Sequence, residues 1–444
     1  MKVLLIASNT ADSPYPVYPL GMGMIARALE DAGHIVMQFD FLASGMDLEA
    51  LDAALKDFSP DLVGVSMRNI DNVNLLNEQR YTGLVKKIVD RVRIATDANV
   101  VLGGTAFSIM PETMLAEIGA DYGIVGEGER LIVELADKIG KGTVTEKILR
   151  GEPSLTGTQI KKAVYDREMM SFYLNSGGIS NVQTKRGCPY NCVYCSYPDL
   201  EGRRFRPRDV NEVIDDIVIL KESHDAKMLF FTDSVFNDDK GYYVHLLEKM
   251  AERGVSVPWS AYIRPQRFDK YIIDLMKKTG VKGVEIGADA ASDTALKGIG
   301  KSFSWNDVID CNNVFADNGI ATSHFFMFGG PCETEETVLL GIDNVINLKR
   351  TVSFMFMGIR ILPDTPLKNL AVKQGIIDQE DDLLEPRYYT APGLDRDWME
   401  RTMKERFKPY RHCVFPPDAL ENSVKFLQKL GHKGLLWDML IPES

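Results

Sequence analysis

The sequence predicts an α/β protein in which a doubly wound parallel sheet is followed by a partial β/α barrel. Three observations support this fold. Short apolar runs alternate with amphipathic stretches near the start, a second alternation follows a polar stretch, and glycines stand after many of the apolar runs. Alternation of strands and helices favours parallel sheets covered by helices. With 444 residues, the chain is long enough for two or three domains.

The first alternation occupies residues 1–140 and predicts a flavodoxin- or Rossmann-like domain. Its strands are expected at residues 2–8, 34–41, 61–67, 99–102 and 122–125. Its helices are expected at residues 21–32, 48–58, 79–95 and 111–118. Ligands of open parallel sheets bind beyond the carboxyl ends of the strands, so the loops after these strands are candidate binding loops.

Residues 141–175 are polar and pattern-poor, and we expect a linker there. The second alternation, at residues 176–370, predicts a (β/α)6 barrel related to the TIM barrel. Its strands are expected at residues 179–184, 227–232, 257–263, 283–286, 321–328 and 352–361. In such barrels the site lies in the loops at the carboxyl ends of the strands. The less regular tail, residues 371–444, is expected to cover the barrel mouth.

Composition excludes several classes of protein. A hydrophobic content of 45% and a charged content of 26% are typical of a globular protein. The net charge of −12 argues against a general nucleic-acid or anionic-membrane surface. No apolar run approaches the roughly 18–20 residues that span a bilayer. Six cysteines without an export signal indicate a reducing compartment. We therefore expect a cytoplasmic protein that neither spans a membrane nor binds nucleic acid.

Three cysteines follow the first barrel strand with the spacing C-x3-C-x2-C: Cys188, Cys192 and Cys195. Clustered thiolates are typical ligands of iron–sulfur clusters. A [4Fe–4S] cluster held by three thiolates keeps one iron without a protein ligand, and that iron can bind a small molecule. Structural zinc usually takes four ligands, often as two separated pairs. Zinc stays an alternative if another cysteine or a histidine supplies the fourth ligand.

These cysteines, together with Tyr194, resemble the signature of the radical S-adenosylmethionine (SAM) superfamily. The resemblance implies a [4Fe–4S] cluster whose open iron chelates SAM. Electron transfer from the cluster then yields a 5′-deoxyadenosyl radical, inside a barrel that excludes water. Tyr194 would cover the cluster or a bound adenine, and ordinary core packing is the alternative for this residue.

The same resemblance implies further SAM contacts at the ends of later strands. They are Asp233, Arg264, Glu285, Asp289 and Gly329. Arg264 is a candidate for the methionine carboxylate, and the family more often has Glu where Asp289 stands. For Asp233 and Arg264, a salt bridge at the barrel rim is the alternative.

A basic patch follows the segment with the three cysteines, which we call the cluster loop. It consists of Arg203, Arg204, Arg206 and Arg208. A solvated face is the default interpretation, and contact with an anionic substrate or an electron donor is the functional one.

Four strings in the first domain occur in an order that resembles the cobalamin-binding domain of B12-dependent radical enzymes. They are residues 18–23, 32–34, 101–105 and 125–129. The resemblance implies cobalamin contacts at Leu20, Arg68, Asn69, Gly103, Gly104, Thr105, Gly126 and Glu127. Glycines at strand ends let the backbone approach a flat macrocycle. A flavodoxin-like domain for another ligand stays open.

One departure from this pattern concerns the cobalt ligand. The string Asp-x-His-x-x-Gly, which supplies a histidine to cobalt in some cobalamin domains, is missing after the third strand. The domain's one histidine, His34, stands at a helix–strand turn. The resemblance therefore implies cobalamin without a histidine ligand, with Arg68 or Asn69 near its lower face.

Taken together, the two resemblances imply a cobalamin-dependent radical SAM methyltransferase. It would move a methyl group from methylcobalamin to an unactivated carbon after hydrogen abstraction by the 5′-deoxyadenosyl radical. A cyclase or oxidase without methyl transfer is the first alternative, and a corrinoid or cluster sensor without turnover is the second. We expect a small-molecule or lipid-like substrate and a flavodoxin- or ferredoxin-type electron donor.

Overall fold

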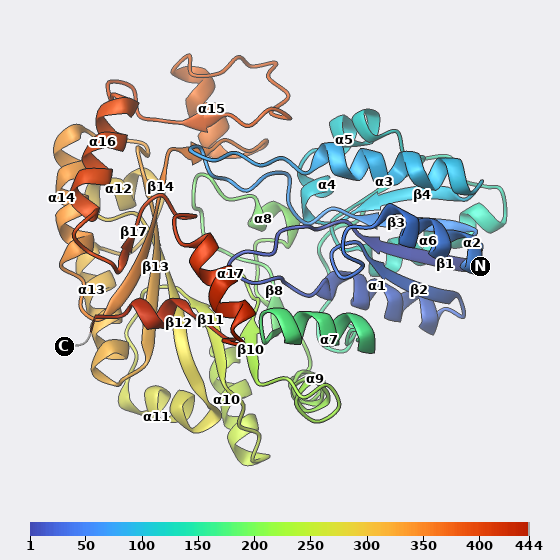
Figure 1. Ribbon diagram of the computed structural model, residues 1–444, viewed down its shortest axis with the longest axis horizontal. Helices are drawn as coiled ribbons and strands as arrows, with labels where there is room; N and C mark the ends of the chain where they lie inside the picture. The colour runs from blue at the N-terminus through green and yellow to red at the C-terminus, as the bar shows by residue number, and fades with distance from the viewer. Residues whose placement is uncertain (443–444) are drawn as a thin grey trace.

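A computed structural model of the chain describes residues 1–442 and contains two parallel sheets (Figure 1). The first sheet, blue to cyan in Figure 1, has the strand order β2-β1-β3-β4-β5-β6. The second sheet, coloured green to red, has the order β17-β14-β13-β12-β11-β10-β7. Within the part of the chain described, no helix is both long and apolar enough to cross a membrane.

The first sheet confirms the five strands and four helices expected from the sequence. Its strands are β1 (Lys2–Ala7), β2 (Ile35–Asp40), β3 (Leu62–Ser66), β4 (Asn99–Gly103), β5 (Tyr122–Val125) and β6 (Ile148–Arg150). Its helices are α1 (Leu20–Asp31), α2 (Leu48–Phe58), α3 (Thr82–Ala95), α4 (Thr105–Ile109), α5 (Pro111–Ile118) and α6 (Gly128–Gly140). The strand order reverses at β1, between β2 and β3, so a ligand crevice is expected beyond the carboxyl ends of β1 and β3.

Three elements of this half were not expected: α4, α6 and β6. The strand β6 lies in the segment assigned to the linker, and it pairs with β5 through three residues. A strand of three residues is too short to show an alternating pattern. The helix α7 (Arg167–Ser176) follows it and leads into the second sheet.

The second sheet confirms the six expected strands to within a few residues. They are β7 (Ile179–Val182), β10 (Met228–Phe231), β11 (Trp259–Ile263), β12 (Val281–Asp289), β13 (Ala321–Phe328) and β14 (Thr351–Met357). A seventh strand, β17 (Cys413–Val414), comes from the tail and pairs with β14. The covering helices are α9 (Val210–Glu222), α10 (Tyr242–Glu252), α11 (Lys270–Thr279), α12 (Asp293–Gly298), α13 (Trp305–Asp317) and α14 (Glu335–Ile346).

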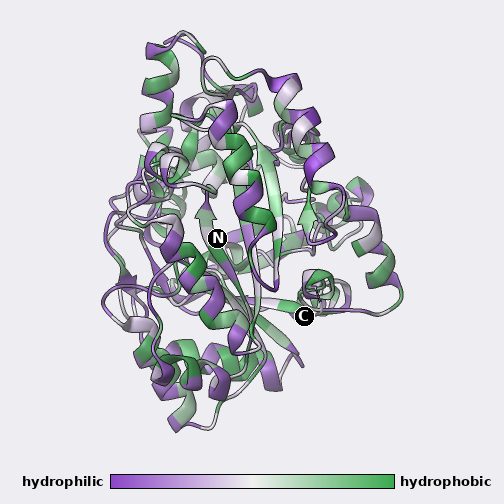
Figure 2. Ribbon diagram, turned by 90° about the vertical axis from the view of Figure 1, so that its left-hand side faces the viewer, coloured by the Kyte–Doolittle hydropathy of each residue, from purple (hydrophilic) through white to green (hydrophobic). Residues whose placement is uncertain are grey.

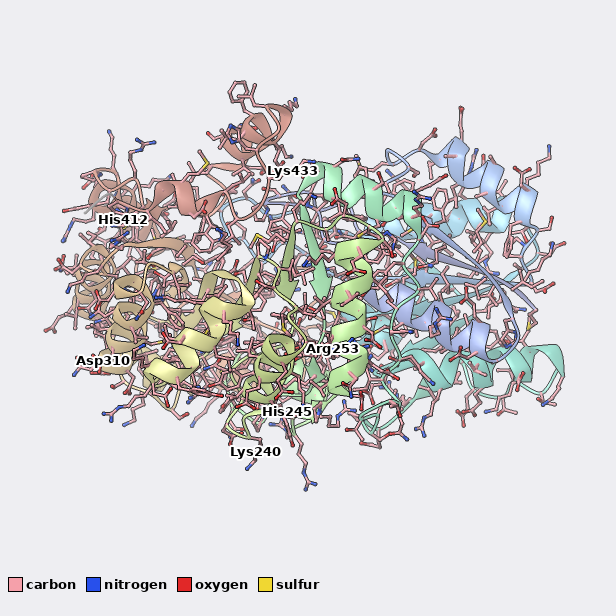
Figure 3. The ribbon with its side chains drawn as sticks, turned by 90° about the horizontal axis from the view of Figure 1, so that it is seen from below. Lys240, His245, Arg253, Asp310, His412 and Lys433 are labelled. Carbon is pink, nitrogen blue, oxygen red and sulfur yellow. The ribbon has the colours of Figure 1, made fainter. Side chains whose placement is uncertain are left out.

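Local sequence explains where many of these helices begin. Asp209 and Asp269 accept hydrogen bonds from backbone N–H groups in the first turns of α9 and α11. Ser304 starts α13 with a reciprocal capping box to Asp307. Figure 2 shows apolar residues on the strands and polar residues on the outer sides of the helices. The side chains labelled in Figure 3 include exposed residues on the outer helices, such as His245 and Asp310.

The remaining short elements belong to the cluster loop and the tail. They are β8 (Lys185–Arg186), α8 (Tyr197–Leu200), β9 (Arg206–Pro207), β15 (Ile359–Arg360), α15 (Pro366–Lys373), β16 (Tyr388–Tyr389), α16 (Arg396–Phe407), α17 (Glu421–Lys429) and the 3-10 helix η1 (Trp437–Leu440).

The tail contacts both ends of the second sheet. At the carboxyl end of β13, a Cβ on Gly329 would lie 3.1 Å from the Met399 side chain. Near the amino end of β12, a Cβ on Gly283 would lie 2.8 Å from Leu435 and 3.1 Å from Trp437. The last segment of the chain therefore packs on the inner face of the sheet near the amino ends of its strands.

Candidate active site between the two sheets

The three cysteines of the triplet lie in the loop that follows β8. This loop begins at Gly187, which has a φ of 89°. A Cβ at this position would lie 2.0 Å from the carbonyl oxygen of Arg204, so the close backbone approach requires glycine. The N–H of Cys188 donates to Gly202 at 2.9 Å, and the N–H of Val193 donates to Ile299 at 3.0 Å. Backbone contacts on both sides thus hold the loop in place.

The chemistry of the three thiols fits a cluster. Burial raises the pKa of the Cys195 thiol to about 12 and raises that of Cys188 as well, so binding to iron displaces their protons. The charge of each neighbouring thiolate raises these values further. Within residues 1–442, no group of three His, Cys, Asp or Glu side chains could hold one metal ion. In a [4Fe–4S] cluster each thiolate binds a different iron.

Tyr194 and Asp289 are joined beside the cluster loop. The Tyr194 hydroxyl donates to Asp289 Oδ2 at 2.6 Å, and the Lys301 ammonium forms an ion pair with the same carboxylate. Lys301 also donates to the carbonyl of Gly287 at 3.2 Å. Burial opposes the charge of Lys301, but Asp289 and the thiolates of Cys192 and Cys195 raise its pKa overall. A cation therefore lies beside the cluster loop, and sequence reasoning missed it because nothing separates Lys301 from other lysines.

Arg264 lies against the cluster loop at the carboxyl end of β11. Its guanidinium stacks over the Tyr190 ring, 4.4 Å from the centroid, and donates to Ser302 Oγ at 2.8 Å. It forms no ion pair with any residue that the structure describes, so the salt-bridge alternative is not realised there. A half-buried arginine without a counter-ion is suited to a carboxylate ligand. The contact with the methionine carboxylate stays a prediction.

Asp233 has a different environment. Its side chain is 1% exposed and accepts hydrogen bonds from the Thr184 N–H at 2.7 Å and from Lys185 Nζ at 2.9 Å. Lys185 is equally buried and also donates to the Phe236 carbonyl at 2.7 Å. The carboxylate thus joins the end of β10 to the start of the cluster loop. This matches the salt-bridge alternative, and a contact with SAM stays a prediction.

Glu285 lies four residues before Asp289 on β12 and is only 6% exposed. At about 3.3 Å per residue, the two Cα atoms are about 13 Å apart along the strand. Glu285 thus lies in the middle of β12, in register with Tyr262 of β11 and Ser323 of β13, and away from the Asp289 end of the strand. The expected contact between Glu285 and SAM is untested, and this position suits contact with another ligand better.

A cavity of about 450 Å³ lies between the two sheets. All of the predicted cobalamin contacts except Asn69 line it. On the opposite side it is lined by Asn181, Arg186, Tyr197, Phe230, Thr232 and Tyr262. Arg68 is exposed in this cavity, so it is the better placed of the two lower-face candidates. His34 lies elsewhere, against the amino terminus, and has a structural role.

The glycines after β4 shape the wall of this cavity. Gly104 has a φ of 94°, and a Cβ there would lie 2.5 Å from the carbonyl oxygen of Met67. Thr105 Oγ1 donates to the carbonyl of Arg68 at 3.1 Å, which ties the loop after β4 to the loop after β3. The wall is therefore backbone without protruding side chains, and such a wall fits a flat macrocycle.

Comparisons with known proteins agree with this geometry. A family model of the B12 binding domain matches residues 7–136, and a model of the radical SAM superfamily matches residues 182–340. The tryptophan 2-C-methyltransferase of Streptomyces laurentii is 27% identical, over 78% of this chain and 71% of that protein. An uncharacterized methyltransferase of Pyrococcus horikoshii is 29% identical, over 76% of each chain. The solved structure of the radical SAM methyltransferase TsrM from Kitasatospora setae, with tryptophan substrate and a SAM analogue bound, superposes with a TM-score of 0.87. It is 25% identical and covers 99% of this chain and 97% of that one.

The chain is a radical SAM enzyme with an amino-terminal cobalamin-binding domain. A [4Fe–4S] cluster, SAM and cobalamin are its cofactors. Cys188, Cys192 and Cys195 are the residues that would hold the cluster, and the loops after β1, β3, β4 and β5 would hold the corrinoid.

Glu127 joins the two halves of the enzyme. Its carboxylate accepts hydrogen bonds from Arg186 Nη1 at 2.9 Å, from Arg206 Nη1 at 2.8 Å and from the Ser154 N–H at 2.8 Å. Burial opposes its ionisation, but Arg186 and the hydrogen bonds lower its pKa overall. The cobalamin contact expected of Glu127 stays a prediction, and its carboxylate already links the cobalamin-binding domain to the barrel.

The basic patch is not one solvated face. Arg206 is largely buried against Glu127, and the side chain of Arg208, 1% exposed, pairs with Asp216 at 2.8 Å. Arg203 alone of these arginines has an exposed ion pair, with Asp199 at 2.9 Å. The default interpretation was therefore wrong for Arg206 and Arg208. Glu127 lies 79 positions from Arg206, and Asp216 meets Arg208 only through the packing of α9, so neither ion pair shows in the sequence pattern.

Proposed function

We propose that the enzyme is a C-methyltransferase that acts on an unactivated carbon of a small molecule. One observation carries the proposal: a single cavity is lined by the predicted cobalamin loops, by the inner face of the barrel and by residues that directly follow the cluster cysteines. A methyl carrier, a radical source and a substrate can meet there. The similar proteins named above are methyltransferases, which supports methyl transfer over a cyclase reaction.

When bound, cobalamin would carry the methyl group, and the cluster would supply the electron that cleaves SAM into methionine and a hydrogen-abstracting 5′-deoxyadenosyl radical. The residues of the chain bind and position these groups. Arg264 is placed to bind a carboxylate beside the cluster loop, while Lys301 and Asp289 hold Tyr194 against it. Phe230 and the tail residue Trp437 exclude water from the inner face.

Several finer statements belong to the same proposal. We assign residues 1–140 to cobalamin binding, 141–175 to a linker, 176–370 to the radical SAM core and 371–444 to a covering extension. A cytoplasmic location is supported by the free cysteines throughout the described chain. The proposal also includes a flavodoxin- or ferredoxin-type electron donor, which would meet a chain with a net charge of −12. The same charge supports the absence of a nucleic-acid partner.

The test is an anaerobic assay of enzyme loaded with cobalamin and cluster, with SAM labelled in its methyl group. Tryptophan, the substrate in the TsrM structure, is the first compound to offer. Label in a product carbon together with 5′-deoxyadenosine is the expected result. A modified product without label would establish the cyclase alternative instead. Cleavage of SAM without transfer to any compound of a broad panel would contradict the proposal.

A further inference from the structure

The inner face of the second sheet carries a band of polar side chains. The register of the parallel strands places Tyr262, Glu285 and Ser323 in one row. Asn181 and Ser260 lie in the next row toward the amino ends, on either side of Phe230. Residues in register on neighbouring strands point to the same face, so these five side chains, which we call the acceptor band, share the interior of the barrel.

Most members of the acceptor band have no protein partner. Asn181 Oδ1, Ser260 Oγ and Ser323 Oγ are buried and make no hydrogen bond within the described residues. Asn181 is 4% exposed and lines the cavity between the sheets. Buried polar atoms in native proteins are nearly always hydrogen-bonded. Several orphaned atoms gathered on one face therefore indicate a place where a ligand supplies the missing partners.

Glu285 is the charged member of the band, and no lysine, arginine or histidine among residues 1–442 pairs with it. Burial raises its pKa to about 7, and the Trp437 side chain only partly offsets that effect. The indole Nε1 of Trp437 itself makes no hydrogen bond of full geometry. A buried carboxylate without a cation is unfavourable, and an ammonium or N–H group of a ligand would remove that penalty.

Two tyrosines connect Glu285 to the cavity. Tyr15, in the loop after β1, and Tyr262, on β11, both line the cavity. Burial raises the pKa of each hydroxyl, and the negative charge of Glu285 raises it further. Tyr262 is 43% exposed, and this surface borders the cavity. The carboxylate is therefore near enough to act on groups that a ligand in the cavity would touch.

An apolar cluster lies beside the acceptor band and indicates what kind of ligand would fit there. Phe230, Leu435 and Trp437 belong to one apolar cluster on the inner face, with Tyr15 and Phe354 packed against it. Of these residues, Phe230 and Tyr15 line the cavity, so aromatic rings bound it on the side of the acceptor band. An anionic group near Glu285 would be repelled by the carboxylate.

We propose that the acceptor band recognises the substrate, and that the substrate is a compact aromatic or apolar molecule whose ammonium or N–H group is bound by Glu285. The word substrate here rests on the proposed methyltransferase function, whereas the chemistry of the ligand rests on the band alone. Glu285 acts as the acceptor, Asn181 and the two serines accept or donate further hydrogen bonds, and Trp437 and Phe230 contact the ring. A lipid without a nitrogen group does not satisfy this site.

The test measures equilibrium binding of three indole compounds that differ in one group: tryptamine, tryptophol and indole-3-propionate. Enzyme loaded with cobalamin and cluster is titrated anaerobically at pH 8 without SAM, by calorimetry. We expect tryptamine to bind about tenfold or more tightly than indole-3-propionate, as a charge-assisted hydrogen bond predicts. Glu285→Gln should remove this preference and leave tryptophol binding unchanged. A 1-methyl derivative of tryptophol then separates recognition of the ring N–H from recognition of the ammonium.

Two variants keep the result interpretable. Glu252→Gln changes an exposed glutamate at the end of the outer helix α10 and should preserve the preference for tryptamine. If Glu285→Gln binds cobalamin poorly, Glu285→Asp serves in its place. Glu285→Asp keeps the negative charge and should retain part of the preference for tryptamine. Equal binding of the three compounds, binding of none of them, or an unchanged preference in Glu285→Gln would each overturn the inference. Because no SAM is present, a failed methyl-transfer assay alongside a Glu285-dependent preference would refute the proposed function alone.

Discussion

Asp233 and Glu285 are two buried carboxylates of the second sheet, and they differ in their partners. Asp233 forms an ion pair with Lys185 at 2.9 Å and accepts further hydrogen bonds from the backbone. Glu285 has no cationic partner among residues 1–442. A paired buried charge holds its surroundings together, whereas an unpaired one costs stability and is typical of a ligand site. The comparison separates groups that maintain the fold from groups that face ligands.

The cluster cysteines are the extreme case of ligand-facing groups. We expect Cys192→Ala to lose the brown chromophore and all formation of 5′-deoxyadenosine, while the apo protein keeps its unfolding midpoint. Iron and sulfide analysis with denaturant titration checks both parts. Cys311→Ala, a buried cysteine on α13 outside the loop, is the matched control and should keep its iron. Catalysis that survives in Cys192→Ala would refute the cluster assignment.

Asp233 represents the opposite case. Asp233→Asn leaves the Lys185 ammonium buried without its main counter-ion, and such changes typically cost about 3–5 kcal/mol. Asp238 lies 3.6 Å from the same ammonium and should keep the loss near the lower end of that range. Denaturant unfolding of the apo protein measures it. An unchanged midpoint would show that the pairing does not stabilise the fold.

Replacing Glu285 should raise the stability of the protein, whereas replacing Asp233 lowers it, and the gain should depend on pH. Its pKa is raised to about 7 in the folded state, from an ordinary value of 4.5, because burial disfavours the charged form. The free energy of unfolding of the wild type is therefore highest below pH 4.5, where the carboxyl group is neutral in both states. It falls as the pH rises from 4.5 through about 7, because only the unfolded state ionises freely there. We therefore expect Glu285→Gln to match the wild type near pH 4.5 and to be more stable at pH 8, by at most about 3 kcal/mol.

A second glutamate serves as the comparison for that experiment. Burial also raises the pKa of Glu333 to about 7, but its carboxylate accepts a hydrogen bond from the Gly330 N–H at 2.7 Å. In Glu333→Gln the amide oxygen can still accept from the Gly330 N–H, but the stronger bond to the ionised carboxylate is lost. This variant should therefore gain less stability at pH 8 than Glu285→Gln. Equal gains would mean that pairing within the protein does not distinguish the two sites.

The sequence predicted the parts of the enzyme that are local in the chain. The cluster loop could be recognised because three thiols fall within eight residues, and the strands because their apolar runs are long enough to show a pattern. The strand β17 has two residues and carries no such pattern. The ion pair of Glu127 with Arg186 joins residues 59 positions apart, and the isolation of Glu285 depends on what its neighbours lack. Neither can be inferred without the packed structure.

Arg68 and Asn69 offer the finest distinction between a ligand-facing and a structural residue, because they are adjacent in the loop after β3. Arg68 is exposed in the cavity and Asn69 does not line it. If Arg68 lies near the lower face of cobalamin, Arg68→Ala should weaken cobalamin binding by about five- to tenfold, the equivalent of about 1 kcal/mol. Asn69→Ala should leave it unchanged. Anaerobic titration of apo protein with cobalamin, followed by absorbance, measures both variants, and the position of the absorption bands reports any change at cobalt. Equal weakening by the two substitutions would mean that the loop acts through its backbone, and Arg68 would then belong with the residues that hold the fold.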